Sequence, residues 1–400
     1  MMRVTLAAAA ILMVTMGARQ SLGLFVSPLN TATGLGIATI SFAYAVAQLM
    51  WGVIQPVAGA VADRYGPAKV LIAGIVVLAI GMALTPFMTS AAGLVLSLGI
   101  LAACGAGIGS FSVLIGAAAQ SLPAERRGKA AGVINAGGSF GQFVFAPITQ
   151  GLIQALGWMG AMWSLAAISL ASIPLVRGVG AQRPVASAAT QATARPWHAA
   201  REALGDRSYL LLHAGFFTCG FHIAFLVTHL PGQVDLCGLP PSVASVSLAL
   251  IGLSNIAGSL LAGAGTARYR SKYILALMYA SRAVLIAVYL AAPKTQWTFY
   301  AFAVGLGLTW LATVPPTATI VGKLFGVRYM ATLFGLTLLS HQIGGFFGAY
   351  LGGIAIARFG SYDWMWYADM ALAALAALVN LPIREAPVVR PPVVDRKSVV

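Results

Sequence analysis

The chain has 400 residues, of which 59% are hydrophobic and 8% are charged, and its formal net charge is +15. A soluble domain carries roughly 25% charged residues, and a chain of this length cannot bury so much apolar surface in a water-soluble core; the composition therefore excludes a soluble enzyme and predicts a membrane protein. The positive charge alone would also suit nucleic-acid binding, and the positions of the charges decide against that class below.

Twelve apolar segments are long enough to cross a bilayer, which takes about 20 residues each. In chain order they cover residues 4–27, 38–62, 69–88, 92–118, 128–155, 158–176, 209–231, 243–266, 272–292, 297–322, 329–357 and 361–381. A polar linker, 177–207, separates the two sets of six, with a short surface helix expected near 197–204. Lipid tolerates only helices or closed barrels, and no ten-residue alternating strands occur, so we predict an all-α membrane fold.

The first segment also resembles a secretory signal peptide, because Arg3 precedes an apolar stretch that reaches Gly17-Ala18. The apolar character continues past Arg19 to Leu29, which is too far for a signal core, so we interpret the segment as a spanning helix. The three cysteines (Cys104, Cys219 and Cys237) have the spacing of neither a disulfide framework nor a zinc site.

The basic residues are concentrated in the loops on one side of the predicted membrane spans. Of 24 Lys and Arg residues, two lie within helices, two lie at outer ends, and the other 20 fall at the N-terminus, in alternate loops or in the C-terminal tail. This bias places both termini in the cytoplasm of a bacterial cell, with the chain in the inner membrane. The basic surface is therefore a topology signal and no footprint of nucleic acid.

The two sets of six helices repeat at a spacing of about 203 residues. Matching pairs include Pro28 with Pro231, Gly141 with Gly344 and Trp163 with Trp366. We predict two pseudo-symmetric six-helix bundles, 1–176 and 208–382, joined by the linker and followed by a tail, 383–400. Parallel repeats of this kind form transporters with a site at the midplane between them.

A motif lies between the second and third segments. It reads Gly59-Ala-Val-Ala-Asp63-Arg64-Tyr-Gly66-Pro-Ala-Lys69, and a partial copy without the acid runs from Gly263 to Lys272. This motif resembles the signature loop of the major facilitator superfamily. The resemblance implies that fold, and it implies that Gly59, Asp63, Arg64, Gly66 and Lys69 form a conformational gate that meets the eleventh helix near Arg328–Tyr329. The alternative is a pair of topology charges without further role.

Within that superfamily, the chain is similar to bacterial relatives of monocarboxylate and oxalate–formate carriers, chiefly through Arg19–Phe25 and the 328–353 stretch. The resemblance implies a carboxylate substrate. The chain departs from those carriers in the eighth helix, where their substrate-binding arginine corresponds to a position near Ser259.

Polar residues inside predicted spans are the candidate site. Arg19 has no acid within its helix, and an unpaired buried cation is costly unless an anion neutralises it. At the repeat spacing, Arg19 corresponds to His222 in the seventh helix, so we expect both to face one ligand. His341 and Gln342 lie at mid-depth of the eleventh helix. Histidine changes charge near neutral pH, so His222 and His341 are candidates for proton coupling; a hydrogen-bonded neutral histidine is the alternative for each.

Other polar residues within the predicted spans are weaker candidates for the binding site. Asn255 and Trp310 are further candidates for substrate binding, although interface bonds and packing would equally explain them. For Arg282 and Asp369, in peripheral helices, we expect a structural ion pair or separate groups that reach the interface.

The sequence favours a monomeric secondary carrier for a small organic anion, driven by protons or by exchange and without cofactor or metal. No acid lies in the first, fourth, seventh or tenth segment, where a carrier of cationic drugs would be expected to have one, and no Walker loop or zinc pattern occurs. An exporter of a hydrophobic compound is the main alternative. A membrane sensor without transport is a third possibility, against which the complete Gly59–Lys69 motif argues.

Overall fold

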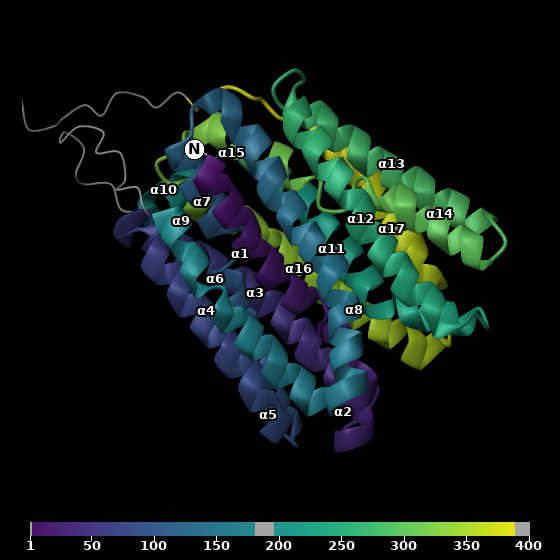
Figure 1. Ribbon diagram of the computed structural model, residues 1–400. Helices are drawn as coiled ribbons and strands as arrows, with labels where there is room; N and C mark the ends of the chain where they lie inside the picture. Colours follow the sequence, from purple (N-terminus) through teal and green to yellow (C-terminus); the bar gives the residue numbers. More distant parts are fainter. Residues whose placement is uncertain (1, 181–195, 389–400) are drawn as a thin grey trace, which may run out of the picture.

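A computed structural model describes residues 2–180 and 196–388, and all regular elements within these ranges are helical (Figure 1). The first half of the chain contains α1 (Met2–Gln20), α2 (Val26–Thr33), α3 (Ile37–Tyr65), α4 (Pro67–Leu84), α5 (Ala91–Leu94), α6 (Ala103–Ile108), α7 (Phe111–Ser121), α8 (Ala124–Ala171) and α9 (Val176–Gly180). The second contains α10 (Pro196–Ala203), α11 (Arg207–Leu236), α12 (Pro241–Gly265), α13 (Ser271–Ala291), α14 (Gln296–Gly307), α15 (Val314–Phe325), α16 (Met330–Phe359) and α17 (Asp363–Asn380). The predicted all-α class is confirmed.

Nine helical stretches in the described part of the chain are long and apolar enough to cross a membrane. One of them, Ala124–Val179, covers two predicted segments, because its backbone leaves the helical conformation at Gly157 (φ 70°, ψ 171°). This positive φ is one that glycine adopts at little cost. The predicted tenth segment is divided into α14 and α15, and the predicted twelfth coincides with α17.

Three of the long helices are interrupted where the sequence suggests continuous spans. Helix α1 ends at Gln20 and continues as a 3-10 turn, Leu22–Phe25, before α2. The fourth segment contains a π-helical stretch, Val95–Ala102, and breaks at Gly109–Ser110 before α7. The residues 308–313 form turns between α14 and α15, and the two prolines that follow lie in the first turn of α15, where a missing N–H costs nothing.

The most extensive contacts between the two halves of the chain are along two helix pairs. Helix α3 packs against α16, and α8 packs against α12, whereas α1, α3, α4 and α6 lie on one side of the molecule and α12, α13, α14 and α17 on the other (Figure 1). Glycine permits the close approach: a Cβ on Gly59 of α3 would lie 2.5 Å from the carbonyl oxygen of Ala331. Small residues are typical of such interfaces, because packing in lipid depends on close van der Waals contact.

Parts of the predicted linker and tail contact the helical bundle. The predicted surface helix is α10, and its contacts are with α3 and α16. In the predicted tail, the Glu385 carboxylate accepts a hydrogen bond from the Lys272 amide (2.7 Å) and pairs with the Lys323 ammonium (2.7 Å). The remaining residues of the linker and tail, 181–195 and 389–400, lie outside the described residues, so the predicted domain boundaries stay predictions.

Candidate functional site

A small cavity lies at the centre of the molecule, where the two halves of the chain face each other. Its volume is about 20 Å³, which is room for a water molecule and for no organic ligand. The lining comes from α1, α3, α7, α11, α15, α16 and the 308–313 turns, and it consists of Met16, Arg19, Gln20, Gln48, Trp51, Phe111, Phe216, Gly220, Ile223, Ala224, Val227, Leu311, Val314, Leu338, His341 and Gln342. A ligand at this site therefore requires the halves to separate.

Arg19 is the one permanent cation in this lining. Its guanidinium donates a hydrogen bond to the Gln48 side-chain oxygen of α3 and lies over the Trp51 ring, 4.5 Å from the centroid. Among residues 2–180 and 196–388, no carboxylate forms an ion pair with Arg19. The guanidinium has one amide and one ring as partners, and it has further N–H donors for a ligand.

The local fold explains this placement. Arg19 lies in the last turn of α1, where the chain leaves the helical path. The helix C-terminus is the negative end of the helix dipole, which favours a cation there. Gln48 and Trp51 are three residues apart on α3 and therefore share one face of that helix.

His341 and Gln342 also line the cavity, opposite Arg19 on α16. The Gln342 amide and the His341 Nδ1 are 2.6 Å apart, and the Nε2 of the ring is buried without a hydrogen-bond partner among the described residues. Helix α11 packs on the His341 backbone through Gly220, where a Cβ would lie 1.5 Å from the His341 carbonyl oxygen. The structure thus brings together three predicted site residues: Arg19, His341 and Gln342.

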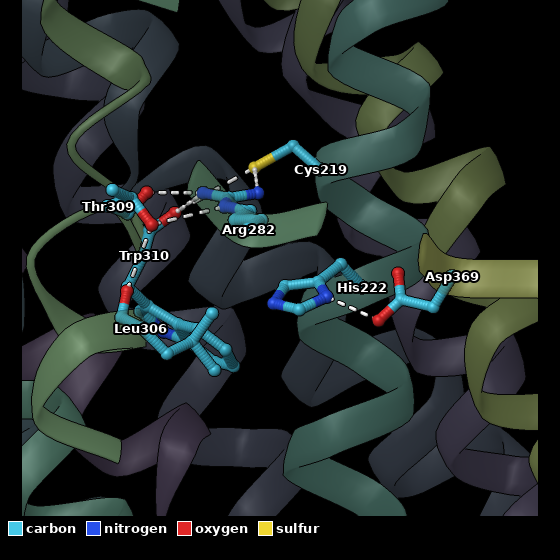
Figure 2. Close-up of polar contacts among 7 residues, drawn as sticks. All are labelled: Cys219, His222, Arg282, Leu306, Thr309, Trp310 and Asp369. Carbon is cyan, nitrogen blue, oxygen red and sulfur yellow. Dashed lines mark hydrogen bonds and ion pairs between the residues drawn. The ribbon is translucent and has the colours of Figure 1, made fainter. Parts of the chain in front are cut away.

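His222 has a different environment from the one predicted. Its Nδ1 lies 2.5 Å from a carboxylate oxygen of Asp369 in α17, and both side chains are fully buried (Figure 2). The ring is absent from the cavity lining, which corrects the expectation that His222 and Arg19 face one ligand. Asp369 has this histidine as its ion-pair partner, so of the two alternatives for Arg282 and Asp369, the mutual ion pair does not form.

Arg282 binds backbone instead. Its guanidinium donates to the carbonyl oxygens of Thr309 and Trp310, and to the Cys219 sulfur at 3.3 Å (Figure 2). These carbonyls belong to the interruption between α14 and α15, where helical hydrogen bonds are missing. A buried arginine that satisfies such carbonyls stabilises the interruption within the membrane. Trp310 itself is fully buried outside the cavity lining, with its ring 5.9 Å from that of His222.

Asn255 lies at the interface of α8 and α12, in a reciprocal arrangement. The Asn255 amide donates to the Ser139 hydroxyl (2.5 Å), and the Asn135 amide donates to the Ser259 hydroxyl (2.8 Å). The same two asparagines hold both backbone groups of Leu311, because Asn255 accepts from its N–H (3.0 Å) and Asn135 donates to its carbonyl (2.5 Å). Asn255 therefore positions the interruption and has no place in the lining.

The motif residues lie at the end of the molecule that carries the basic loops. Asp63 of α3 accepts hydrogen bonds from the backbone N–H (3.0 Å) and the hydroxyl (2.8 Å) of Thr332, at the first turn of α16, and from Gln120 (2.9 Å). Arg64 and Lys69 are exposed, and Gly66 (φ 90°) separates α3 from α4. The carboxylate thus joins the two halves at a helix N-terminus, where negative charge is favoured.

The prediction from sequence missed Gln48 and Trp51. A glutamine in the middle of an apolar segment is the signal that could have found them, because buried amides need partners. No three His, Cys, Asp or Glu side chains within the described ranges come together as a metal site.

Known proteins match this chain over most of its length. The family model of the Major Facilitator Superfamily matches residues 8–349. Monocarboxylate transporter 13 of Rattus norvegicus is 26% identical over 376 residues, which cover 92% of this chain and 85% of that protein. The oxalate:formate antiporter of Oxalobacter formigenes is 21% identical over 371 residues, covering 91% and 85%. A probable sulfoacetate transporter of Cupriavidus necator is 31% identical over 152 residues, covering 38% and 32%.

Proposed function

The chain belongs to the Major Facilitator Superfamily of secondary transporters, which are not enzymes, and we propose that this member moves a small organic anion, a carboxylate, by alternating access. Arg19 carries the proposal. It is a cation in the central cavity with no carboxylate partner in the described part of the chain, and an anionic ligand would complete its hydrogen bonds. The relatives named for monocarboxylates, oxalate, formate and sulfoacetate agree with an anionic substrate.

The lining favours a monoanion. Arg19 supplies one permanent positive charge, and most of the other lining residues are apolar, among them Trp51, Phe111 and Phe216. Ser259, near the position to which the resemblance assigns the substrate-binding arginine of similar carriers, is bonded to Asn135 at the helix interface and brings no charge. A dianion would leave one charge uncompensated in a site of low dielectric, which is costly.

We place the protein in the bacterial inner membrane with both termini in the cytoplasm, because the basic loops gather at one end, and we propose that it acts as a monomer. The chain then crosses the membrane twelve times, with α8 counted twice and α14 with α15 counted once, in two six-helix bundles, 1–176 and 208–382. The Asp63–Thr332 contact closes the gate at the cytoplasmic end. Transport is driven by protons or by exchange.

A second candidate, export of a hydrophobic compound, is favoured by one observation: Trp51, Phe111, Phe216 and Leu338 give the cavity an apolar wall. Such a substrate would bind without Arg19, and expression of the protein would confer drug resistance. The two candidates therefore differ in what they require of the guanidinium.

The experiment measures uptake of labelled formate, pyruvate, benzoate and oxalate by wild-type protein in proteoliposomes. We expect uptake of at least one monoanion and weak or no uptake of oxalate. Arg19→Ala should abolish the uptake while the protein still inserts, and Arg201→Ala, at an exposed arginine of α10, is the matched control. Unchanged uptake in Arg19→Ala would remove the anion site and leave hydrophobic export as the better proposal.

A further inference from the structure

We propose that His222 and Asp369 form the proton-binding site of this transporter, separate from the anion site at Arg19. The inference rests on the proposed function, since it names the group through which a proton gradient would drive anion uptake. Neither side chain lines the central cavity. The pair lies between α11 and α17, behind the wall to which Gly220 and Ile223 contribute.

Asp369 is unusual among the acids of this chain. Of the eight Asp and Glu residues that the structure describes, it alone lies within a helix and away from its ends, six residues into α17, which is about 9 Å at 1.5 Å per residue. Its side chain has 0% exposure and that of His222 has 1%. Ionisable residues at such depth are rare, and they often belong to ion or proton pathways.

The His222–Asp369 pair has polar atoms without hydrogen-bond partners, at which another proton could bind. One contact, between Nδ1 and Oδ2 at 2.5 Å, joins the two residues. The other ring nitrogen (Nε2), the other carboxylate oxygen (Oδ1) and the neighbouring Trp310 Nε1 are buried without partners in the described part of the molecule. Buried polar atoms are seldom left unpaired, and here three of them surround one hydrogen-bonded His–Asp pair.

The protonation step is simple to balance. With neutral His222 donating from Nδ1 to the Asp369 carboxylate, the pair has a charge of −1. One proton from the outer solution adds at Nε2, which gives an imidazolium–carboxylate pair of charge 0, and the same proton leaves on the other side of the membrane. Movement of one monocarboxylate with one proton transfers no net charge.

The pair reaches the central cavity through the interrupted helix. The Trp310 ring lies beside His222 (5.9 Å between centroids), and the Trp310 carbonyl is held by Arg282. The next residue, Leu311, lines the cavity, and its backbone is bonded to Asn135 and Asn255 at the interface of the two halves. A change of charge at His222 therefore acts on a segment that contacts both the anion site and the interface across which the halves move.

The groups around the pair limit what else could titrate. Asp369 is the acid that contacts His222, Arg282 is the nearest permanent cation of α13, and α12 contributes no titratable side chain. The other titratable groups that face this region from the helices packed on α11 and α13, and from α11 itself, are Cys219, His229, Tyr279, Tyr289 and His341. Of these, His341 belongs to the lining of the central cavity.

The test separates exchange from accumulation in proteoliposomes loaded with valinomycin and potassium. The probe is whichever of pyruvate, formate and benzoate the wild-type protein exchanges fastest. We expect Asp369→Asn and His222→Gln to keep exchange within about twofold of wild type and to lose at least tenfold in accumulation driven by an inward proton gradient. Asp363→Asn, at the exposed start of the same helix, and His198→Gln, at an exposed position of α10, are the matched controls.

Asp369→Glu keeps a protonatable carboxyl, so it should accumulate the anion where Asp369→Asn does not. The dependence of this accumulation on pH should be shifted from that of the wild-type protein, which a merely structural role for Asp369 would not cause. Wild-type accumulation in Asp369→Asn, or an unchanged pH profile in both Asp369→Glu and His222→Gln, would overturn the proton site. Should Asp369→Asn fail to fold, the latter two variants still decide. If the wild-type protein neither exchanges nor accumulates any of the three anions, the proposed function fails, and this is visible without any variant.

Discussion

Removal of the charge at Asp63 is expected to open the end of the molecule that carries the basic loops. The Asp63 carboxylate joins α3 to the first turn of α16 through the Thr332 N–H at 3.0 Å and the Thr332 hydroxyl at 2.8 Å. A third bond, from Gln120 of α7, lies within the first half of the chain and does not hold the halves together. Asp63→Asn keeps the size of the side chain and one acceptor oxygen, but it removes the charge.

The size of the effect follows from these contacts. A hydrogen bond to a charged group contributes about 1.5–3 kcal/mol and a neutral one about 0.5–1.5 kcal/mol, so two bonds that lose their charge lose about 2 kcal/mol. The favourable placement of a carboxylate at a helix N-terminus adds roughly 0.3–1 kcal/mol. The closed state should therefore lose about 3 kcal/mol, which raises the ratio of open to closed molecules by about 100-fold at 1.4 kcal/mol per tenfold.

The distance between the two halves reports this ratio. Spin labels at Tyr65 and Tyr269, which are exposed and correspond in the sequence repeat, can be introduced after replacement of Cys104 and Cys237, while Cys219 is buried and stays. Electron–electron double resonance should show a longer distance gaining population in Asp63→Asn.

The control for the spin-label experiment is Asp206→Asn, because Asp206 also caps a helix, α11, but through the nearby Tyr209 N–H within its own half of the chain. An Asp63→Asn distance distribution identical to that of wild type would refute the role of this carboxylate in closure.

Three further variants test the packing and the cavity. Gly220→Ala places a Cβ 1.5 Å from the His341 carbonyl oxygen, so the thermal unfolding midpoint in detergent should fall, in line with an overpacking cost of about 1–3 kcal/mol. Asn255→Leu leaves the Leu311 N–H unpaired; a lower unfolding midpoint, from a loss of about 1–3 kcal/mol, is expected in the same assay. Trp51→Leu removes the ring under Arg19 and should raise the KM of anion uptake about two- to thirtyfold, from a cation–π loss of roughly 0.5–2 kcal/mol, with Trp51→Phe intermediate; an unchanged KM would contradict this contact.

The helices could be predicted from the sequence because lipid requires long apolar segments. Predicted bounds such as 272–292 and 329–357 differ by one or two residues from α13 and α16. The interruptions could not be predicted in the same way. Apolar length contains no information on where a helix breaks inside the membrane, and the break at 308–313 depends on Arg282 from another helix to satisfy its carbonyls. Pro315 and Pro316 gave a local signal, but they mark only where the next helix starts.

The sequence predicted the charged residue of the candidate site, Arg19, but not the residues that contact it. Arg19 stood out because a cation in an apolar segment needs an explanation, and His341 and Gln342 share its cavity. The repeat spacing related His222 to Arg19 by position along the helix, but direction around the helix axis also matters, and the ring points to Asp369. Contacts between distant helices, such as Gln48 with Arg19, depend on tertiary packing that no local pattern contains.

The two arginines inside the membrane differ in what already binds them, and this difference separates a structural role from a binding role. Arg282 donates to two carbonyls and a sulfur, and its guanidinium lies 5.4 Å from the Tyr279 ring centroid, so a helix interruption already uses its donors. Arg19 has one amide partner and one ring, and it lies in the lining of a cavity. Because an incompletely paired guanidinium in a low-dielectric site binds an anion more strongly than a fully bonded one, the substrate belongs at Arg19. Loss of Arg282 should instead affect folding, through the unpaired carbonyls that would remain.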